Sequence, residues 1–143
     1  MKFMIIRKAD AETEANVLPT QELIDAMLAH NQEMVDSGVM LMGEGLGPSS
    51  QGARVKFHGG KPTVIDGPFA EARELIGGFS IIEVPSLADA VAWVCKWPQI
   101  DGHGEVENEI MRVLTADDFG DAFTPELREK EDRMREDMEK RQQ

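Results

Sequence analysis

The chain has 143 residues, which favours one domain with a sizeable core. It carries 27 acidic against 15 basic side chains, and this net charge of −12 argues against nucleic-acid or membrane-surface binding. The lone Cys95 cannot form an internal disulfide, and no apolar run approaches the roughly 20 residues of a membrane span. These features predict a cytoplasmic protein.

The first forty residues predict a strand, a loop and an amphipathic helix. Residues 2–8 form an apolar run with basic ends, typical of a buried strand, and residues 10–19 are polar and acidic, typical of a loop. Thr20 is placed to cap the helix, and Gly38 is placed to end it in a left-handed conformation.

The middle of the chain predicts a strand, a glycine-rich turn and a hairpin. Residues 39–42 form the strand, and residues 43–48 contain three closely spaced glycines. Alternating residues over 53–58, the Gly59-Gly60 turn signal and the run 62–65 predict a half-exposed hairpin. Residues 66–75 then cross through a tight turn and a short helical step into the next strand.

The second half predicts a strand over 78–84, a helix capped by Ser86 and a last strand over 106–114. The helical period places Trp93 on the outer side of this helix. Its inner face is formed by Leu87, Ala90, Val91 and Val94.

Without the hairpin, the order of elements is β-α-β-β-α-β. This order predicts an α+β, ferredoxin-like antiparallel sheet with an inserted β-hairpin and two helices on one face. An uncovered sheet face and an outward Trp93 together predict a homodimer.

The sequence predicts a domain over residues 1–114 and a charged helical tail over residues 115–143. Thr124-Pro125 is typical of a helix start, and Phe119, Phe123 and Leu127 are spaced by four. The tail is either a solvated helix or an arm whose phenylalanines dock on a partner subunit.

One block is specific enough to suggest a family. The run from Asp66 to Glu71, Asp-Gly-Pro-Phe-Ala-Glu, followed by Arg-Glu-Leu-Ile-Gly-Gly-Phe, resembles the DGPF-bearing branch of the YCII-related protein family. Similar segments lie at residues 43–50, 52–55, 104–107, 116–120 and 124–128. The resemblance implies a ferredoxin-like fold of the dimeric α-β barrel type, a catalytic His–Asp pair, and relatives associated with extracytoplasmic-function sigma factors.

The first functional hypothesis is a small-molecule enzyme that uses acid/base chemistry. Its pocket would lie between the first long helix, the 43–48 loop and the 66–74 crossing. His30 interrupts the apolar stripe of that helix and suits proton transfer near neutral pH, so it is the expected base, with Asp66 as its partner or as the acid. The substrate-binding candidates, which suit a ligand with an anionic group through the arginine, are Glu44, Phe69, Glu71 and Arg73.

The chain departs from the family at two of these positions. The family's histidine lies about one turn earlier, near Met27, and Arg73 stands where relatives usually have lysine. The two cations are not interchangeable.

Other interpretations stay open at this point. Asp66 can cap its own turn, His30 can be a core histidine, and the whole block can be a fold-defining turn. The alternative function is a non-catalytic ligand-binding or regulatory dimer associated with transcription. No metal-ligand spacing and no cofactor motif emerges, so no cofactor is expected.

Overall fold

The computed structural model describes residues 1–143, apart from the side chain of Arg73. The chain divides into two compact units, Met1–Arg112 and Val113–Gln143. Within the described part of the chain, none of the helices combines the length and the apolar composition needed to span a bilayer.

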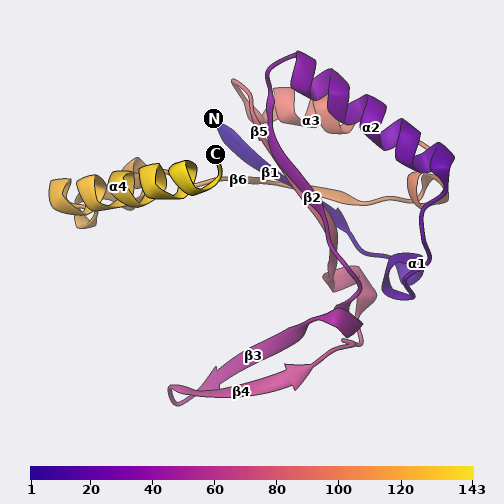
Figure 1. Cartoon of the computed structure of the whole chain (residues 1–143), viewed down its shortest axis with the longest axis horizontal. Helices are drawn as coiled ribbons and strands as arrows, with labels where there is room; N and C mark the ends of the chain where they lie inside the picture. Colours follow the sequence, from indigo (N-terminus) through magenta and orange to yellow (C-terminus); the bar gives the residue numbers. More distant parts are fainter. The chain divides into compact units, whose positions relative to one another are not determined.

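The first unit is built on a four-stranded antiparallel sheet with the order β2-β5-β1-β6 (Figure 1). Its strands are β1 (Lys2–Lys8), β2 (Met40–Gly45), β5 (Ile76–Glu83) and β6 (Asn108–Arg112). The architecture is mixed α+β, and the strand order is consistent with the predicted ferredoxin-like arrangement.

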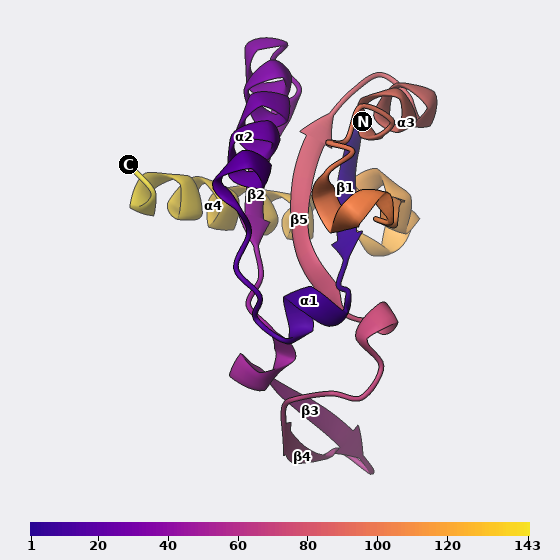
Figure 2. The same ribbon diagram turned by 90° about the vertical axis from the view of Figure 1, so that its right-hand side faces the viewer.

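Two helices, α2 (Gln21–Asp36) and α3 (Leu87–Val94), lie on the same side of this sheet (Figures 1 and 2). Alternate residues of β1 point toward them, because successive side chains of a strand face opposite ways. The core between the layers is formed by Phe3, Ile5, Met34, Ile82, Val84 and Ala90.

The predicted helix boundaries are confirmed by their caps. The Thr20 hydroxyl accepts a hydrogen bond from the Leu23 N–H, and the Ser86 hydroxyl accepts one from the Asp89 N–H. Gly38 follows α2 with φ +74°, in the left-handed region that favours glycine.

The segment predicted as a loop over residues 10–19 contains a short helix, α1 (Ala11–Glu14), so that prediction is wrong for its first half. Asp10 and Thr13 form a capping box in which each side chain accepts from the other's N–H at 2.8 Å. The polar composition of the segment hid this local pairing, which satisfies two helix-end donors.

Trp93 does not point outward as predicted, but packs against the core beside Val94. Its indole also lies 4.5 Å from the Lys96 ammonium. Leu87 and Val91, predicted on the inner face, are exposed. Only Ala90 of this eight-residue helix is fully buried, so the helix meets the sheet over one turn. The homodimer prediction therefore loses its support from Trp93.

The glycine-rich turn predicted after residue 42 begins later, since Gly43 and Gly45 lie within β2. Gly45 is paired with Gly78 on β5. A Cβ built on Gly78 would come within 3.1 Å of the Glu44 carbonyl oxygen. The lack of a side chain at Gly78 therefore permits the close pairing of β5 with β2.

The predicted hairpin forms a separate two-stranded sheet of β3 (Ala53–His58) and β4 (Lys61–Asp66). Gly59 and Gly60 make its turn with φ +56° and +76°. Figure 1 shows it extending away from the four-stranded sheet. The sequence predicts a half-exposed hairpin, but every residue of both strands is exposed, because neither face packs against the four-stranded sheet.

The second unit contains a 3₁₀ segment (Ala116–Ala122) and α4 (Pro125–Arg141). The Thr124 hydroxyl caps α4 as predicted, accepting from the Leu127 N–H. The rings of Phe119 and Phe123 lie 5.9 Å apart. The remaining short 3₁₀ turns are Ser49–Gln51, Ala72–Glu74 and Asp101–Gly104.

Candidate functional site

A cavity of about 910 Å³ lies between α2 and the sheet, and α1 and the Asp101–Gly104 turn also contribute to its wall. Its long sides are the inner face of α2 and the glycine-rich segment from Gly43 to Pro48. These are two of the three walls expected from the sequence. The third, the 66–74 crossing, is not among the described lining residues.

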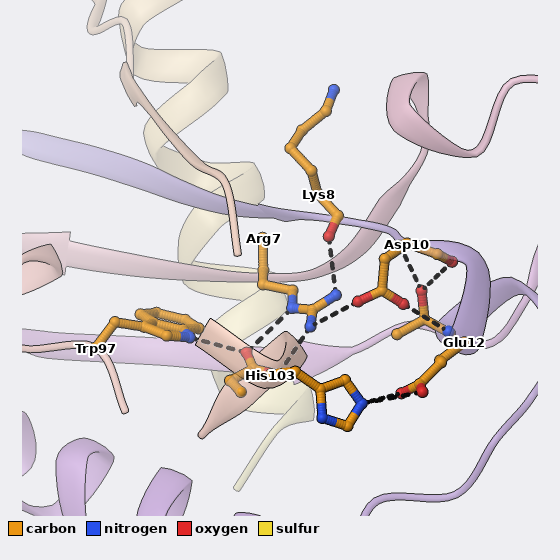
Figure 3. A network of polar contacts seen from close by, with 8 residues as sticks. Arg7, Lys8, Asp10, Glu12, Trp97 and His103 are labelled. Carbon is orange, nitrogen blue, oxygen red and sulfur yellow. Dashed lines mark hydrogen bonds and ion pairs between the residues drawn. The ribbon is translucent and has the colours of Figure 1, made fainter. Parts of the chain in front are cut away.

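The Arg7 side chain lies in the cavity wall, held by two carboxylates (Figure 3). Its guanidinium donates to both oxygens of Asp101, at 3.1 Å from Nε and 2.7 Å from Nη2. The same Nη2 lies 3.3 Å from Asp10 Oδ2, and the Trp97 indole N–H donates to Asp101 at 2.9 Å. This bidentate arrangement joins β1 to the segment after α3 across 94 residues of sequence.

The carboxylates fix the charge of this cluster. Burial alone would lower the pKa of Arg7, but the hydrogen bond and charge of Asp101, with a further contribution from Asp10, raise it. Burial tends to raise the pKa of Asp10, whereas the Thr13 N–H and Arg7 outweigh this and lower it. The guanidinium is therefore charged but already neutralised, which leaves it little capacity to hold a further anion.

His103 and Glu12 form a second polar pair beside the cavity (Figure 3). The His103 Nε2 lies 3.0 and 3.1 Å from the two Glu12 carboxylate oxygens. The hydrogen bond and charge of Glu12 raise the pKa of His103. His103 has φ +56°, a backbone conformation that is uncommon outside glycine.

From the sequence, His103 lies between two glycines, which indicates an exposed loop, and its side chain is exposed. The pairing with Glu12 is missed by that reasoning, because the two residues are 91 positions apart. The signal in the sequence for this unusual turn is a histidine between two glycines. Gly102 and Gly104 also have positive φ and set the conformation of the turn.

Of the predicted site residues, Glu44 lines the cavity. His30 does not, although its neighbour Asn31 does. The His30 ring is buried and meets the Trp97 ring edge-on, with centroids 5.6 Å apart. Burial lowers the pKa of His30, and the positive charge of Lys96 lowers it further. The negative charge of Glu33 tends to raise this pKa but does not outweigh burial.

Asp66, Phe69 and Glu71 lie away from the cavity, so the structure does not bring Asp66 and His30 to a common wall. Asp66 ends β4 opposite Ala53 and is exposed. The Phe69 ring lies under the Arg54 guanidinium at 4.0 Å, which anchors the loop to the hairpin. Glu71 is exposed before a 3₁₀ turn. The side chain of Arg73 lies outside the described residues.

The Asp-Gly-Pro-Phe turn is held by a contact that the sequence did not reveal. The Ser49 hydroxyl accepts from the Phe69 N–H at 2.9 Å and donates to Glu14 at 2.6 Å, and the Ser49 N–H also donates to Glu14. A Cβ on Gly67 would overlap the Ser49 carbonyl. The turn is thus capped by the Ser49 hydroxyl. One interpretation of the sequence was that Asp66 would cap its own turn.

The described residues include no group of three or more histidine, cysteine or acidic side chains placed to hold a metal ion. The polar groups in the cavity lining, apart from the Arg7 cluster, include Thr13, Asn16, Thr20, Glu22, Asn31, Glu44, Ser80 and the His103–Glu12 pair.

Comparison with known proteins identifies the family. The model of the YCII-related domain matches residues 1–114, and the chain belongs to this family. Among curated proteins, none matches the chain at a significant level. A similar solved structure is 5-chloro-2-hydroxyhydroquinone dehydrochlorinase (TftG) from Burkholderia phenoliruptrix AC1100, in complex with 2,5-dihydroxybenzoquinone. The identity is 17%, the match covers 80% of this chain and 94% of that chain, and the TM-score is 0.44. A likeness of this degree says nothing about chemistry in this chain.

Proposed function

We propose that this chain is a small-molecule enzyme whose substrate occupies the cavity between α2 and the sheet, where acid/base groups act on it. The cavity carries the proposal: it has about 910 Å³ of space, apolar walls from α2 and a few polar groups that converge on it. Cavities of this size and lining are the usual form of small-molecule sites.

Placement of this chain in the DGPF branch of the YCII-related family remains a prediction.

The charges around the cavity favour a neutral or cationic ligand. Asp10, Glu12 and Glu44 all contribute to the wall, and the Arg7 guanidinium there is neutralised by Asp101 and Asp10. An anion would meet net negative charge, and its binding would be opposed. The anionic ligand expected from the sequence depended on Arg73.

For proton transfer, the described residues favour the His103–Glu12 pair. It lies at the cavity, and a histidine titrates close to neutral pH. A carboxylate partner raises the pKa of the imidazole, so His103 serves best as a general acid. The His30–Asp66 pair remains a second prediction, and the two pairs are separated by mutation.

The binding site is tested by filling the cavity. Met27→Trp places a large side chain among the lining residues, whereas Val35→Trp alters an exposed position of the same helix outside the cavity. A set of neutral, cationic and anionic small molecules is screened by thermal shift. A ligand at 100 times its Kd should stabilise the folded protein by about 2.7 kcal/mol. Neutral or cationic compounds should stabilise the wild-type protein and Val35→Trp but not Met27→Trp. Equal stabilisation of both variants would place the ligand elsewhere.

Catalysis is then separated from simple binding. Each bound compound is incubated with the protein, and its conversion is followed by mass spectrometry. His103→Gln should retain binding and lose turnover, while His30→Gln and Asp66→Asn should retain both. Loss of turnover in the last two variants would instead favour the His30–Asp66 pair. Binding without conversion of any compound would favour the non-catalytic alternative.

We also propose that the protein is a homodimer of the α-β barrel type. The sheet face opposite α2 and α3 carries an apolar patch formed by Met4, Ile6, Phe79, Ile81 and Met111, as the strand register indicates. No described helix of the first unit covers these residues. An apolar sheet face of this kind is a typical interface between copies.

A further inference from the structure

The hairpin of residues 53–66, called the arm from this point on, lacks the contacts that normally stabilise two strands. Its strands pair only with each other, and all their residues are exposed. An isolated two-stranded hairpin is marginally stable in water. Phe57, for example, is 71% exposed and Val64 is 65% exposed. The arm therefore has the character of a segment that is covered by something else.

The two faces of the arm differ in chemistry. Val55 pairs with Val64 and Phe57 with Pro62, so these four residues form one apolar face. The opposite face carries Arg54, Lys56, His58 and Lys61. The arm thus has three basic side chains and a single acidic one, Asp66, in a chain whose net charge is −12. Its charge is opposite to that of the body.

The base of the arm holds it away from its own body. Ser49 links Glu14 to the Phe69 N–H, and the Gly67 N–H donates to the Gly52 carbonyl across the base at 3.0 Å. A Cβ on Gly67 would overlap the Ser49 backbone, so the turn accepts no side chain at this position. These contacts anchor the base of the arm, which extends away from the four-stranded sheet of its own chain (Figure 1).

A surface complementary to the arm lies at the mouth of the cavity. Leu18, Leu28 and Leu46 line the cavity and are 77%, 60% and 46% exposed. Carboxylates of Glu12 and Glu22 lie among the same lining residues. An apolar surface with an acidic rim suits an arm that has one apolar face and long basic side chains.

We propose that the arm of one copy docks on the cavity mouth of a second copy, and that the exchange is mutual. Phe57 would meet the apolar mouth. Lys56 and Lys61 start from the opposite face of the arm, and their long side chains would bend around the edges of the two-stranded ribbon to reach the acidic rim. Mutual exchange is the self-complementary contact of a two-fold dimer. In such a dimer each subunit closes the other's cavity. The contact between the arm and the cavity mouth does not depend on the proposed function. The role of the arm as a lid over a substrate rests on that function.

Cross-linking between different molecules tests the contact. In a Cys95→Ser background, Phe57→Cys and Leu28→Cys are prepared as separate proteins with different tags, mixed and treated with a short bis-maleimide. A heterodimeric product should form readily. The control replaces Leu28→Cys by Val35→Cys, which is 52% exposed on the same helix but outside the cavity lining. The Phe57–Val35 product should be minor.

A charge reversal provides the second measurement. Lys56→Glu with Lys61→Glu, added to the Phe57→Cys protein, should lower the yield with Leu28→Cys about three- to tenfold, as two exposed ion pairs allow. Higher salt should lower the yield of the unaltered pair.

Two outcomes would overturn the proposal: equal products with Leu28→Cys and Val35→Cys, or cross-links only between two arms. No ligand is used, so the result is independent of the thermal-shift screen. If the cross-link forms but no compound stabilises the protein in the thermal-shift screen, the proposed function is wrong and the proposed contact of the arm is still supported.

Discussion

Single residues decide which groups can act in the cavity. The sequence predicts Arg7 as part of the basic end of a strand, yet it is the centre of a buried ionic cluster with Asp101 and Asp10. His30 is predicted as a catalytic base because it interrupts an apolar stripe. In the structure it is a buried ring against Trp97, which is the alternative that a core position favours. Both differences arise because the partners lie far away in sequence.

The buried environment of His30 predicts a pH dependence of stability. Its pKa in the folded state lies below the usual value of 6.5, so the unfolded state binds the proton more tightly. The contribution to stability is complete above 6.5 and is lost as the pH falls through the lowered pKa. The free energy of unfolding of the wild-type protein and of His30→Gln is compared by urea denaturation at about pH 7.5 and 5.5. The wild-type advantage should shrink at the lower pH. A constant difference would mean that His30 is solvated in the folded state.

At the scale of elements, the contacts of the Asp-Gly-Pro-Phe turn explain why particular residue types are needed within residues 66–69. Gly67 passes so close to the Ser49 carbonyl that no side chain fits, and Phe69 is held by both Ser49 and Arg54. The block therefore secures the base of the arm. This supports the interpretation of a fold-defining turn, and it accounts for the motif without a catalytic role for Asp66.

Replacing Gly67 tests this account. Gly67→Ala should destabilise the protein by about 1 to 3 kcal/mol, the range seen for overpacking. Gly45→Ala is the matched control, because a Cβ there meets nothing within 4 Å. Its stability should be unchanged or slightly higher, since alanine suits a strand better than glycine. Chemical denaturation measures both variants. A loss no larger in Gly67→Ala than in Gly45→Ala would contradict the contact with Ser49.

At the scale of the molecule, the two units differ in how they are stabilised. The first has an apolar core between the helices and the sheet. The second relies on local contacts, such as the ring contact of Phe119 with Phe123 and the ion pair of Arg128 with Asp117 at 2.9 Å. The apolar stripe of α4 is exposed at Leu127, Met134 and Met138. The solvated helix and the docking arm both stay predictions, since an apolar stripe exposed in one chain fits either of them.

Truncation distinguishes the two interpretations of the tail. A chain that ends before Phe119 should unfold with the same free energy as the first unit of the full chain, because the ring contact and the ion pair of the tail join residues close in sequence. Sedimentation should yield the same association constant for both. Weaker association of the truncated chain would instead show that the phenylalanines dock on a partner subunit.

The sequence by itself determined the α+β class, the order of the four sheet strands and of helices α2 and α3 along the chain, and the caps at Thr20, Ser86 and Thr124; its Asp-Gly-Pro-Phe block also indicated the family. These features rest on periodicity, capping and turn chemistry, which act over a few residues. The tertiary structure alone decided the cavity's polar groups, because Arg7 meets Asp101 and Glu12 meets His103 only after folding. The tertiary structure also determines that the 66–71 block anchors the base of the exposed arm. Ser49 contacts this block and Glu14 contacts Ser49, and both residues come from other elements. Local patterns specify elements, whereas side-chain partners depend on which strands and loops become neighbours.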